Sequence, residues 1–325
     1  MSDEQAQTPH TLGDQDMPAL FHHADRKSVS AQKFYFGWLR WELILLGLGV
    51  LVGAFNGVTR SIGPVSLVVP PFPVFGYRIT TLTAFEIAEA GLLALALAMR
   101  LARVFTRPER LWYEARAVAE SVKSIAWRYA VGGEPFQEAY SPDELQAVVA
   151  NRFDGINTDL SQYHAPDAVL QQHRVTPAMD AVRGLPLAAR RQVYREGRVE
   201  DQQGWYTGKS RFNHRRALQA HWTLIVVEVL AVFAALLPIG LAALHVFPLN
   251  LQSLAANIAG GGAAWMQAKR YEDLDVSYKV TAKELAQVAK DIENQHDESA
   301  WARFVENAEG SMSREHQLWR ATRTD

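Results

Sequence analysis

The sequence predicts an all-α membrane protein that has four transmembrane helices in two pairs and long amphipathic helices in the cytoplasm. Three observations predict this fold class. Four apolar runs, each close to the length that a helix needs to cross a bilayer, occur as two closely spaced pairs. The basic residues lie almost entirely on one side of these runs. The charged segments that flank the pairs repeat apolar residues at the spacing of a helix face.

The composition excludes several classes of function. The 325 residues carry 33 basic and 35 acidic side chains, a balance that is untypical of a nucleic-acid-binding protein. The chain has no cysteine, which excludes disulfides, cysteine-ligated metals and a thiol nucleophile. It also lacks the P-loop, GxGxxG, HExxH and GxSxG motifs. We therefore expect no catalytic residue, no cofactor, no metal and no nucleic-acid partner.

The predicted spans are four runs of residues, 42–59, 79–99, 222–244 and 246–268. Each run approaches the length of about 20 mostly apolar residues that crosses a bilayer. The alternative is a set of buried helices in a water-soluble protein, and it is disfavoured because such helices are usually shorter or carry a polar stripe. The fourth run is the least apolar, since it contains Asn257 and three consecutive glycines.

The basic residues set the topology. Of the 33 basic residues, only Arg60 and Arg78 lie in the two short connections within the pairs. The excess of basic residues on the cytoplasmic side of membrane proteins therefore places both termini and the central segment in the cytoplasm. Residues 1–21 have an acidic start and no early apolar stretch, so we expect a disordered tail rather than a signal peptide.

Capping residues predict further helices between the spans. A capping box at Thr106 begins a helix over 106–131, which ends at Gly132. The other predicted helices begin at Ser141, at Thr176 and at Pro186, and the last of these runs into the third span.

Two predicted helices carry apolar residues spaced alternately three and four apart, over residues 111–129 and 271–292. Such a spacing lines one side of a helix and is typical of helices that pack along their length. Packing against helices of the same chain is the favoured interpretation, because each seam is only about three heptads long. Oligomerisation through the seams is the alternative.

The plan of the chain is repeated. Each half has a helix before its spans, two spans joined by a short turn, and a helix with an apolar seam after them. A short match, Gln32 to Tyr35 against Gln203 to Tyr206, precedes both pairs. We predict a tail over 1–21, a first two-span module over 22–140, a linker with a short helix over 141–175 and a second module over 176–325.

Residues spread over about 22–320 give the sequence its resemblance to a known family. It resembles the SLATT superfamily, the two-transmembrane effector domains that associate with SMODS and SLOG proteins, in two tandem copies. The positions that carry the resemblance include Gln32, Tyr35, Glu120, Trp127, Arg198, Gln202, Trp205, Tyr206, Glu315 and His316.

The resemblance implies a non-enzymatic bacterial membrane effector. It implies a protein of the inner, cytoplasmic membrane that forms pores or disrupts the membrane in a stress, conflict or antiphage defence system signalled by nucleotides. A sensor or nucleotide-synthesising partner encoded nearby would supply the trigger. This sequence departs from the family pattern because two modules are fused in one chain.

Small residues spaced four apart form ridges on the predicted spans. The first span carries Gly49, Gly53 and Gly57, and the fourth carries Ala256, Gly260 and Ala264. Such ridges let helix backbones approach closely in lipid. They are compatible with packing inside a single four-span bundle and with assembly into a homo-oligomer.

Three carboxylates lie well inside the predicted spans, away from their first and last residues: Glu86 and Glu89 in the second and Glu228 in the third. A carboxylate near the bilayer centre costs about 2.5–3.5 kcal/mol on insertion scales, so each needs a water-filled path or a partner. One interpretation is a cation-preferring pore, because acidic rings favour cations. The other is that these groups are protonated and hydrogen-bonded to neighbouring helices, or lie nearer the interface.

Two functions fit these features. The first is a pore-forming or membrane-disrupting effector embedded in the lipid bilayer. The alternative is a membrane-anchored adaptor whose cytoplasmic helices bind a soluble partner. A pore should depolarise a membrane by itself, whereas an adaptor should retain a partner and leave the membrane potential unchanged.

Overall fold

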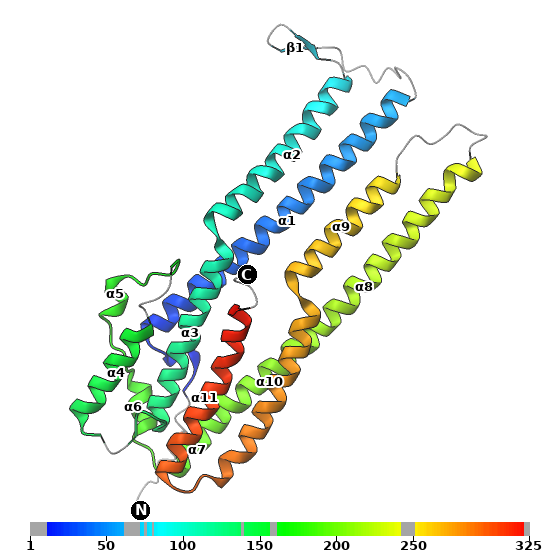
Figure 1. Cartoon of the computed structure of the whole chain (residues 1–325). Helices are drawn as coiled ribbons and strands as arrows, with labels where there is room; N and C mark the ends of the chain where they lie inside the picture. Colours follow the sequence, from blue (N-terminus) through cyan, green and yellow to red (C-terminus); the bar gives the residue numbers. More distant parts are fainter. Residues whose placement is uncertain are drawn as a thin grey trace, which may run out of the picture. The chain divides into compact units, whose positions relative to one another are not determined.

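The computed structural model describes residues 12–61, 72–74, 77–79, 81–137, 140–156, 161–241 and 251–321. Nearly all of these residues are helical (Figure 1). The first part of the chain forms the short 3-10 helix η1 (Asp14–Asp16) and the helices α1 (Ala19–Ser61), α2 (Thr81–Thr106), α3 (Pro108–Val131), α4 (Pro142–Ile156) and α5 (Asp167–Leu170).

The second part begins with two short helices and continues into long ones. Its elements are α6 (Pro177–Arg183), α7 (Leu187–Tyr194), the π-helical turn η2 (Arg195–Glu200), α8 (Asp201–Leu241), α9 (Leu251–Lys269), α10 (Tyr271–Asp291), the 3-10 turn η4 (Ile292–Asn294) and α11 (Glu298–Ala321). The segment α7–η2–α8 is helical without a break, as the sequence predicts for a helix that runs into the third span.

One hairpin departs from the predicted all-helical fold. Strands β1 (Phe72–Val74) and β2 (Tyr77–Ile79) pair antiparallel, with Phe72 opposite Ile79 and Val74 opposite Tyr77. These are the only strands in the described part of the chain. Aromatic and β-branched residues favour extended backbone, and here they lie in the connection between the first two predicted spans.

The predicted helix ends at Ser141, Thr176 and Gly132 are confirmed, but the capping box at Thr106 is wrong, because Thr106 is the last residue of α2 and its hydroxyl donates to the Ala102 carbonyl at 2.8 Å. Ser141 caps α4 through two reciprocal hydrogen bonds with Glu144. The Ser141 backbone N–H donates to a Glu144 carboxylate oxygen at 2.8 Å, and the Ser141 hydroxyl oxygen accepts from the Glu144 backbone N–H at 3.4 Å. Thr176 caps α6 by accepting from the Met179 N–H at 3.4 Å. Helix α3 ends at Gly132, which adopts a φ of 75° that other residues avoid.

The chain divides into two compact units that do not follow the order of the sequence. Unit 1 comprises residues Met1–Lys33, Pro108–Arg211 and Asp275–Asp325, and unit 2 comprises Phe34–Arg107 and Phe212–Leu274. Unit 2 therefore contains all four predicted spans, and unit 1 contains the segments before, between and after them.

Unit 1 has a conventional apolar core around α3. The indole of Trp127 packs edge-on against Tyr194, with 5.9 Å between the ring centroids, and Tyr194 packs in the same way against Trp301 at 5.6 Å. All three side chains are at most 1 % exposed. Aromatic pairs in this geometry stabilise a core by more than their buried area alone.

The end of α3 is fixed by two side chains from distant segments. The Val131 carbonyl accepts from Trp301 Nε1 at 2.7 Å and from Arg190 Nη1 at 3.0 Å. A helix leaves its last carbonyls without partners in the helix, so these two donors satisfy a group that would otherwise be buried unpaired. The contact ties α7 and α11 to the same turn of α3.

Both predicted apolar seams pack within the chain. The seam of α3 contributes Val118, Val122 and Tyr129 to the core of unit 1, and the seam of α10 contributes Leu285 to the same core. The favoured interpretation of the seams is thus confirmed for these residues.

Unit 1 also buries an ion pair between two charged side chains. Arg198 on η2 donates from Nε and Nη2 to the two carboxylate oxygens of Glu309 on α11, at 2.9 and 2.8 Å. The two side chains are 3 % and 0 % exposed. The Tyr194 hydroxyl donates to Glu309 Oε1 at 3.0 Å. Burial and the Glu309 charge raise the pKa of Tyr194 well above its ordinary value, which keeps this hydroxyl a donor.

Unit 2 has the opposite distribution of apolar residues. Its helices form the pairs α1 with α2 and α8 with α9 (Figure 1). Along α8, large apolar side chains are exposed, among them Trp222 at 65 %, Leu230 at 60 % and Phe233 at 62 %. Continuous exposure of this kind marks a surface that contacts lipid or protein rather than water.

Among the described residues, two helical stretches are long and apolar enough to cross a membrane, Ala19–Phe55 and Leu187–Phe233. Only 17 % and 6 % of their most apolar segments are buried, whereas a core helix of a soluble protein would be mostly buried. The first and third predicted spans overlap these stretches, over 42–55 and 222–233.

Over the residues that the structure describes, two such helices are thus identified, whereas the sequence predicts four. The second predicted span lies in α2, where Glu86 and Glu89 precede the apolar stretch and Arg100 and Arg103 follow it. The fourth predicted span overlaps α9.

The buried pair in unit 1 gives a stability test. Replacing Glu309 by Gln leaves the Arg198 charge buried without a counter-charge, so we expect a loss of about 3–5 kcal/mol in the free energy of unfolding. The double substitution Arg198→Met with Glu309→Leu removes both charges and is expected to recover most of that loss. Denaturant unfolding of the detergent-solubilised chain measures both. A Glu309→Gln protein as stable as the parent would contradict the account of the pair.

Candidate functional site

The glycine ridge on α1 packs against α2 of the same chain. A Cβ added at Gly49 would lie 3.1 Å from Leu93 Cδ2, and one added at Gly53 would lie 2.6 Å from Glu89 Oε1. The ridge therefore provides the close approach that small residues allow. Gly57 lies outside the residues whose surroundings the structure describes.

The ridge predicted on α9 faces away from the described chain. Ala256 and Ala264 are exposed, and a Cβ added at Gly260 would meet no atom within 4 Å. The contact with α8 is made by Gly262 instead, where an added Cβ would lie 2.9 Å from Leu224 Cδ2. The predicted ridge is thus open to a neighbouring molecule.

The three carboxylates of the predicted spans have different surroundings. Glu89 is half-buried and points at Gly53 of α1. Glu86 is exposed on α2. Glu228 is exposed on α8 between Val226 and Leu230, which are themselves 55 % and 60 % exposed. Glu89 thus fills a gap inside a helix pair, whereas Glu228 lies on a surface that is otherwise apolar.

An ion pair that the sequence reasoning missed joins α1 to α2. Arg103 Nη2 donates to Glu42 Oε2 at 2.7 Å, and the Glu42 side chain is 7 % exposed. The guanidinium of Arg103 also lies over the ring of Tyr35, 5.7 Å from its centroid. The sequence does hold a signal for this pair, because Glu42 begins the first predicted span and Arg103 follows the second.

Most of the positions that carry the family resemblance are structural. Trp127 and Arg198 belong to the core of unit 1 described above, and Glu120 forms an ion pair with Arg116 at 2.5 Å. Tyr35 packs under Arg103, and Trp205 and Tyr206 pack on Tyr278 with centroids 5.6 and 5.5 Å apart. Gln32 and Gln202 are half-buried. Glu315 and His316 lie outside the side chains that the structure describes.

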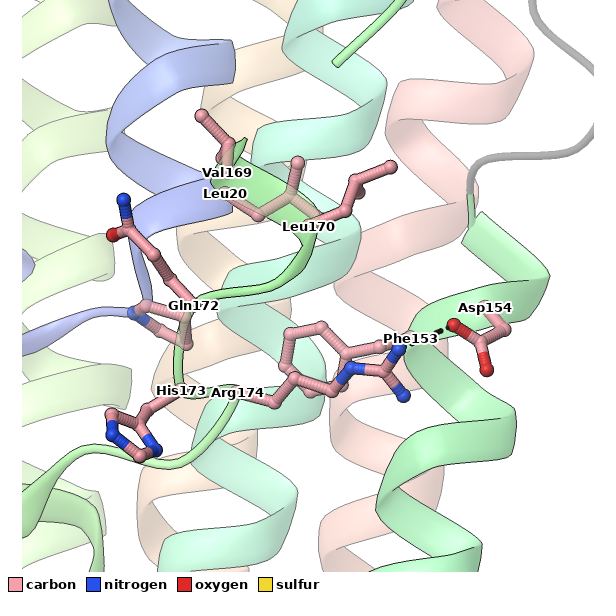
Figure 2. Close-up of a pocket in the computed structure, with 9 residues that line it drawn as sticks. Leu20, Phe153, Asp154, Val169, Leu170, Gln172, His173 and Arg174 are labelled. Atoms are coloured by element: carbon pink, nitrogen blue, oxygen red, sulfur yellow. Dashed lines mark hydrogen bonds and ion pairs between the residues drawn. The ribbon is translucent and has the colours of Figure 1, made fainter. Parts of the chain in front are cut away.

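A small pocket in unit 1 lies between the start of α1, α4 and α5 (Figure 2). Leu20, Phe153 and Leu170 form its apolar lining. Arg174 reaches across to Asp154, with 2.6 Å between Nη2 and Oδ1, and its Nη1 donates to the Ala150 carbonyl at 2.9 Å. The charge of Arg174 is thus already matched within the chain. The described residues contain no cluster of His, Cys, Asp and Glu that would hold a metal ion.

The Glu42–Arg103 pair gives a second test. Arg103→Gln leaves the buried Glu42 carboxylate without its charged donor, so we expect a loss of about 1–3 kcal/mol in stability, measured as thermal unfolding in detergent. Exchanging the two residues, Glu42→Arg with Arg103→Glu, keeps a pair and should restore part of the loss. An Arg103→Gln protein that unfolds at the same temperature as the parent would contradict a stabilising role for this pair.

Comparison with known proteins identifies both halves of the chain. Residues 18–191 match the family described as SMODS and SLOG-associating 2TM effector domain 3, and residues 194–319 match the family described as SMODS and SLOG-associating 2TM effector domain 1. No curated protein and no solved structure matches the chain. The exposed apolar helices agree with the two-transmembrane description and indicate a membrane location. The chain therefore belongs to the SLATT family of membrane effector domains and carries two of these domains in tandem.

Proposed function

We propose that this protein is a non-enzymatic effector of a bacterial inner membrane, which assembles into a homo-oligomer and opens a cation-conducting path when it is triggered. The family supports a membrane effector linked to defence systems. The observation that carries the finer proposal is the exposed carboxylate of Glu228 on the apolar surface of α8.

Glu228 needs an environment that a lipid-facing surface cannot provide. Its neighbours along α8 are apolar over more than a turn on both sides, and Val226, Val229 and Leu230 are 48–60 % exposed. A carboxylate facing hydrocarbon costs about 2.5–3.5 kcal/mol on insertion scales. A second copy of the chain would cover this surface and allow the carboxylates of several subunits to face water. Such a ring of carboxylates favours cations.

The open ridge on α9 supports assembly. Ala256, Gly260 and Ala264 form an exposed stripe of small residues, and such stripes let helices of neighbouring molecules approach closely. Glu86, which is also exposed, is proposed to face the same path. Glu89 is proposed to position α2 on the Gly53 turn of α1.

The proposed topology has four spans and both termini in the cytoplasm. Among the described residues, α1 and α8 contain stretches that are long and apolar enough to cross a membrane. Helices α2 and α9 are proposed to cross the membrane beside them, as the second helix of each pair. The basic residues that flank the pairs support the orientation. The proposed trigger is a sensor or a nucleotide-synthesising enzyme encoded nearby.

The substitution Glu228→Gln tests the proposed path. Induced expression of the parent chain in bacteria should depolarise the membrane, as read with a potential-sensitive dye, and Glu228→Gln should reduce the depolarisation several-fold at equal protein level because the acidic ring is lost. Glu284→Gln, the same change at an exposed position of α10 outside the predicted spans, is the matched control and should behave like the parent.

Two results would overturn the proposal. Equal depolarisation by the parent and by Glu228→Gln would exclude Glu228 from the path. A parent chain that leaves the potential unchanged but copurifies with a soluble partner would instead favour the membrane-anchored adaptor.

A further inference from the structure

A cluster of basic and aromatic side chains lies where α1 and α9 approach each other in unit 2. The ammonium of Lys269 lies 3.3 Å from the centroid of the Phe36 ring and 5.1 Å from that of the Trp265 ring. The guanidinium of Arg40 lies 5.9 Å from the same Trp265 ring. Phe36 and Trp265 pack edge-on, with 6.0 Å between their centroids. Two cations therefore share one aromatic platform.

The positive charge of this cluster has no acidic partner in the described part of the chain. Ion pairs among the described residues of unit 2 join Glu42 to Arg103, His221 to Glu272 and Arg270 to Asp273, and neither Arg40 nor Lys269 takes part in a described pair. Lys269 follows the fourth predicted span, and burial together with the Arg40 charge lowers its pKa to about 8. Aromatic faces attract a cation but leave its full charge in place. An anion placed between the two cations would relieve their repulsion.

The position of the cluster identifies the kind of anion. Arg40 immediately precedes the first predicted span, and Lys269 immediately follows the fourth. By the distribution of basic residues, both belong at the cytoplasmic surface of the membrane. Trp265 has the amphipathic ring that is typical of this depth, and Trp41, next to Arg40, is 56 % exposed. The groups that occupy this depth in a bilayer are the phospholipid headgroups.

We propose that Arg40 and Lys269 bind the phosphate of an anionic phospholipid, and that Trp265 and Phe36 form the platform that holds both cations for it. Basic pockets between transmembrane helices on the cytoplasmic side are suited to such headgroups. Because Arg40 lies in the first family domain and Lys269 in the second, one bound lipid would bridge the two domains. The site therefore couples the helix pairs of the tandem repeat to the lipid composition of the membrane.

Binding to phosphatidylglycerol tests the site. The full-length protein is incorporated into nanodiscs of phosphatidylcholine with a minor fraction of phosphatidylglycerol, and bound phosphatidylglycerol is counted by native mass spectrometry. The double substitution Arg40→Gln with Lys269→Gln should weaken retention of phosphatidylglycerol by about tenfold or more, because each basic residue at the surface contributes to the attraction. Retention of phosphatidylcholine should not change.

Two further variants make the result specific. Arg26→Gln with Lys27→Gln removes the same charge from exposed positions about four turns earlier in α1 and should retain phosphatidylglycerol like the parent. Arg40→Lys with Lys269→Arg keeps both charges and should also retain it. This variant separates loss of the charge from disturbance of the fold.

Three outcomes would overturn the proposal. Equal retention by the parent and the Arg40→Gln, Lys269→Gln protein would show that these cations do not bind the lipid. Equal weakening by the Arg26→Gln, Lys27→Gln control would show attraction by overall charge rather than a site. If millimolar inorganic phosphate displaces phosphatidylglycerol from the parent but not from the Arg40→Gln, Lys269→Gln protein, the site binds free phosphate instead of a lipid.

Discussion

The exposed apolar surface of unit 2 is the constraint on which the rest of this structure depends. Trp222, Leu230 and Phe233 of α8 are each more than half exposed, while Trp127, Tyr194 and Trp301 in the core of unit 1 are at most 1 % exposed. In water such a surface would be covered by a partner, whereas in a bilayer it is in its preferred solvent. Every polar group of unit 2 must then be matched within the protein or at the membrane surface. The Glu42–Arg103 pair meets this condition inside the chain.

The tandem arrangement changes what each family domain contributes. Trp127 and Tyr194, which pack against each other, belong to the domains matched over 18–191 and 194–319 respectively. The carbonyl at the end of α3 likewise accepts from Arg190 of one domain and Trp301 of the other. Neither sequence domain is therefore a compact unit by itself. The fusion brings contacts between two modules into one chain, where no association step is needed to form them.

The sequence was sufficient for features that depend on local chemistry. The starts of α4 and α6 follow from capping residues, and the end of α3 follows from the glycine that can adopt a positive φ. The apolar seams follow from helical periodicity. Periodicity identifies the face that is buried but not its partner, so the pairing of Arg198 with Glu309, 111 residues apart, was not predicted.

The same limit explains what was missed in unit 2. A ridge of small residues can pack inside a chain or between chains, and the sequence does not distinguish the two. Here Gly49 and Gly53 meet α2, whereas Ala256, Gly260 and Ala264 remain open. The hairpin of β1 and β2 was missed because three-residue strands are too short to show an alternating pattern. Among the described residues, length and hydropathy identify two of the four predicted spans, and α2 differs from those two in the charges that flank its apolar part.

The most direct measurement of the central claim is the conductance of the purified chain in a planar bilayer with different salt concentrations on the two sides. The reversal potential reports whether cations or anions carry the current. A path lined by Glu228 predicts discrete channels with a reversal potential close to that of the cation. A reversal potential close to that of the anion would contradict the account.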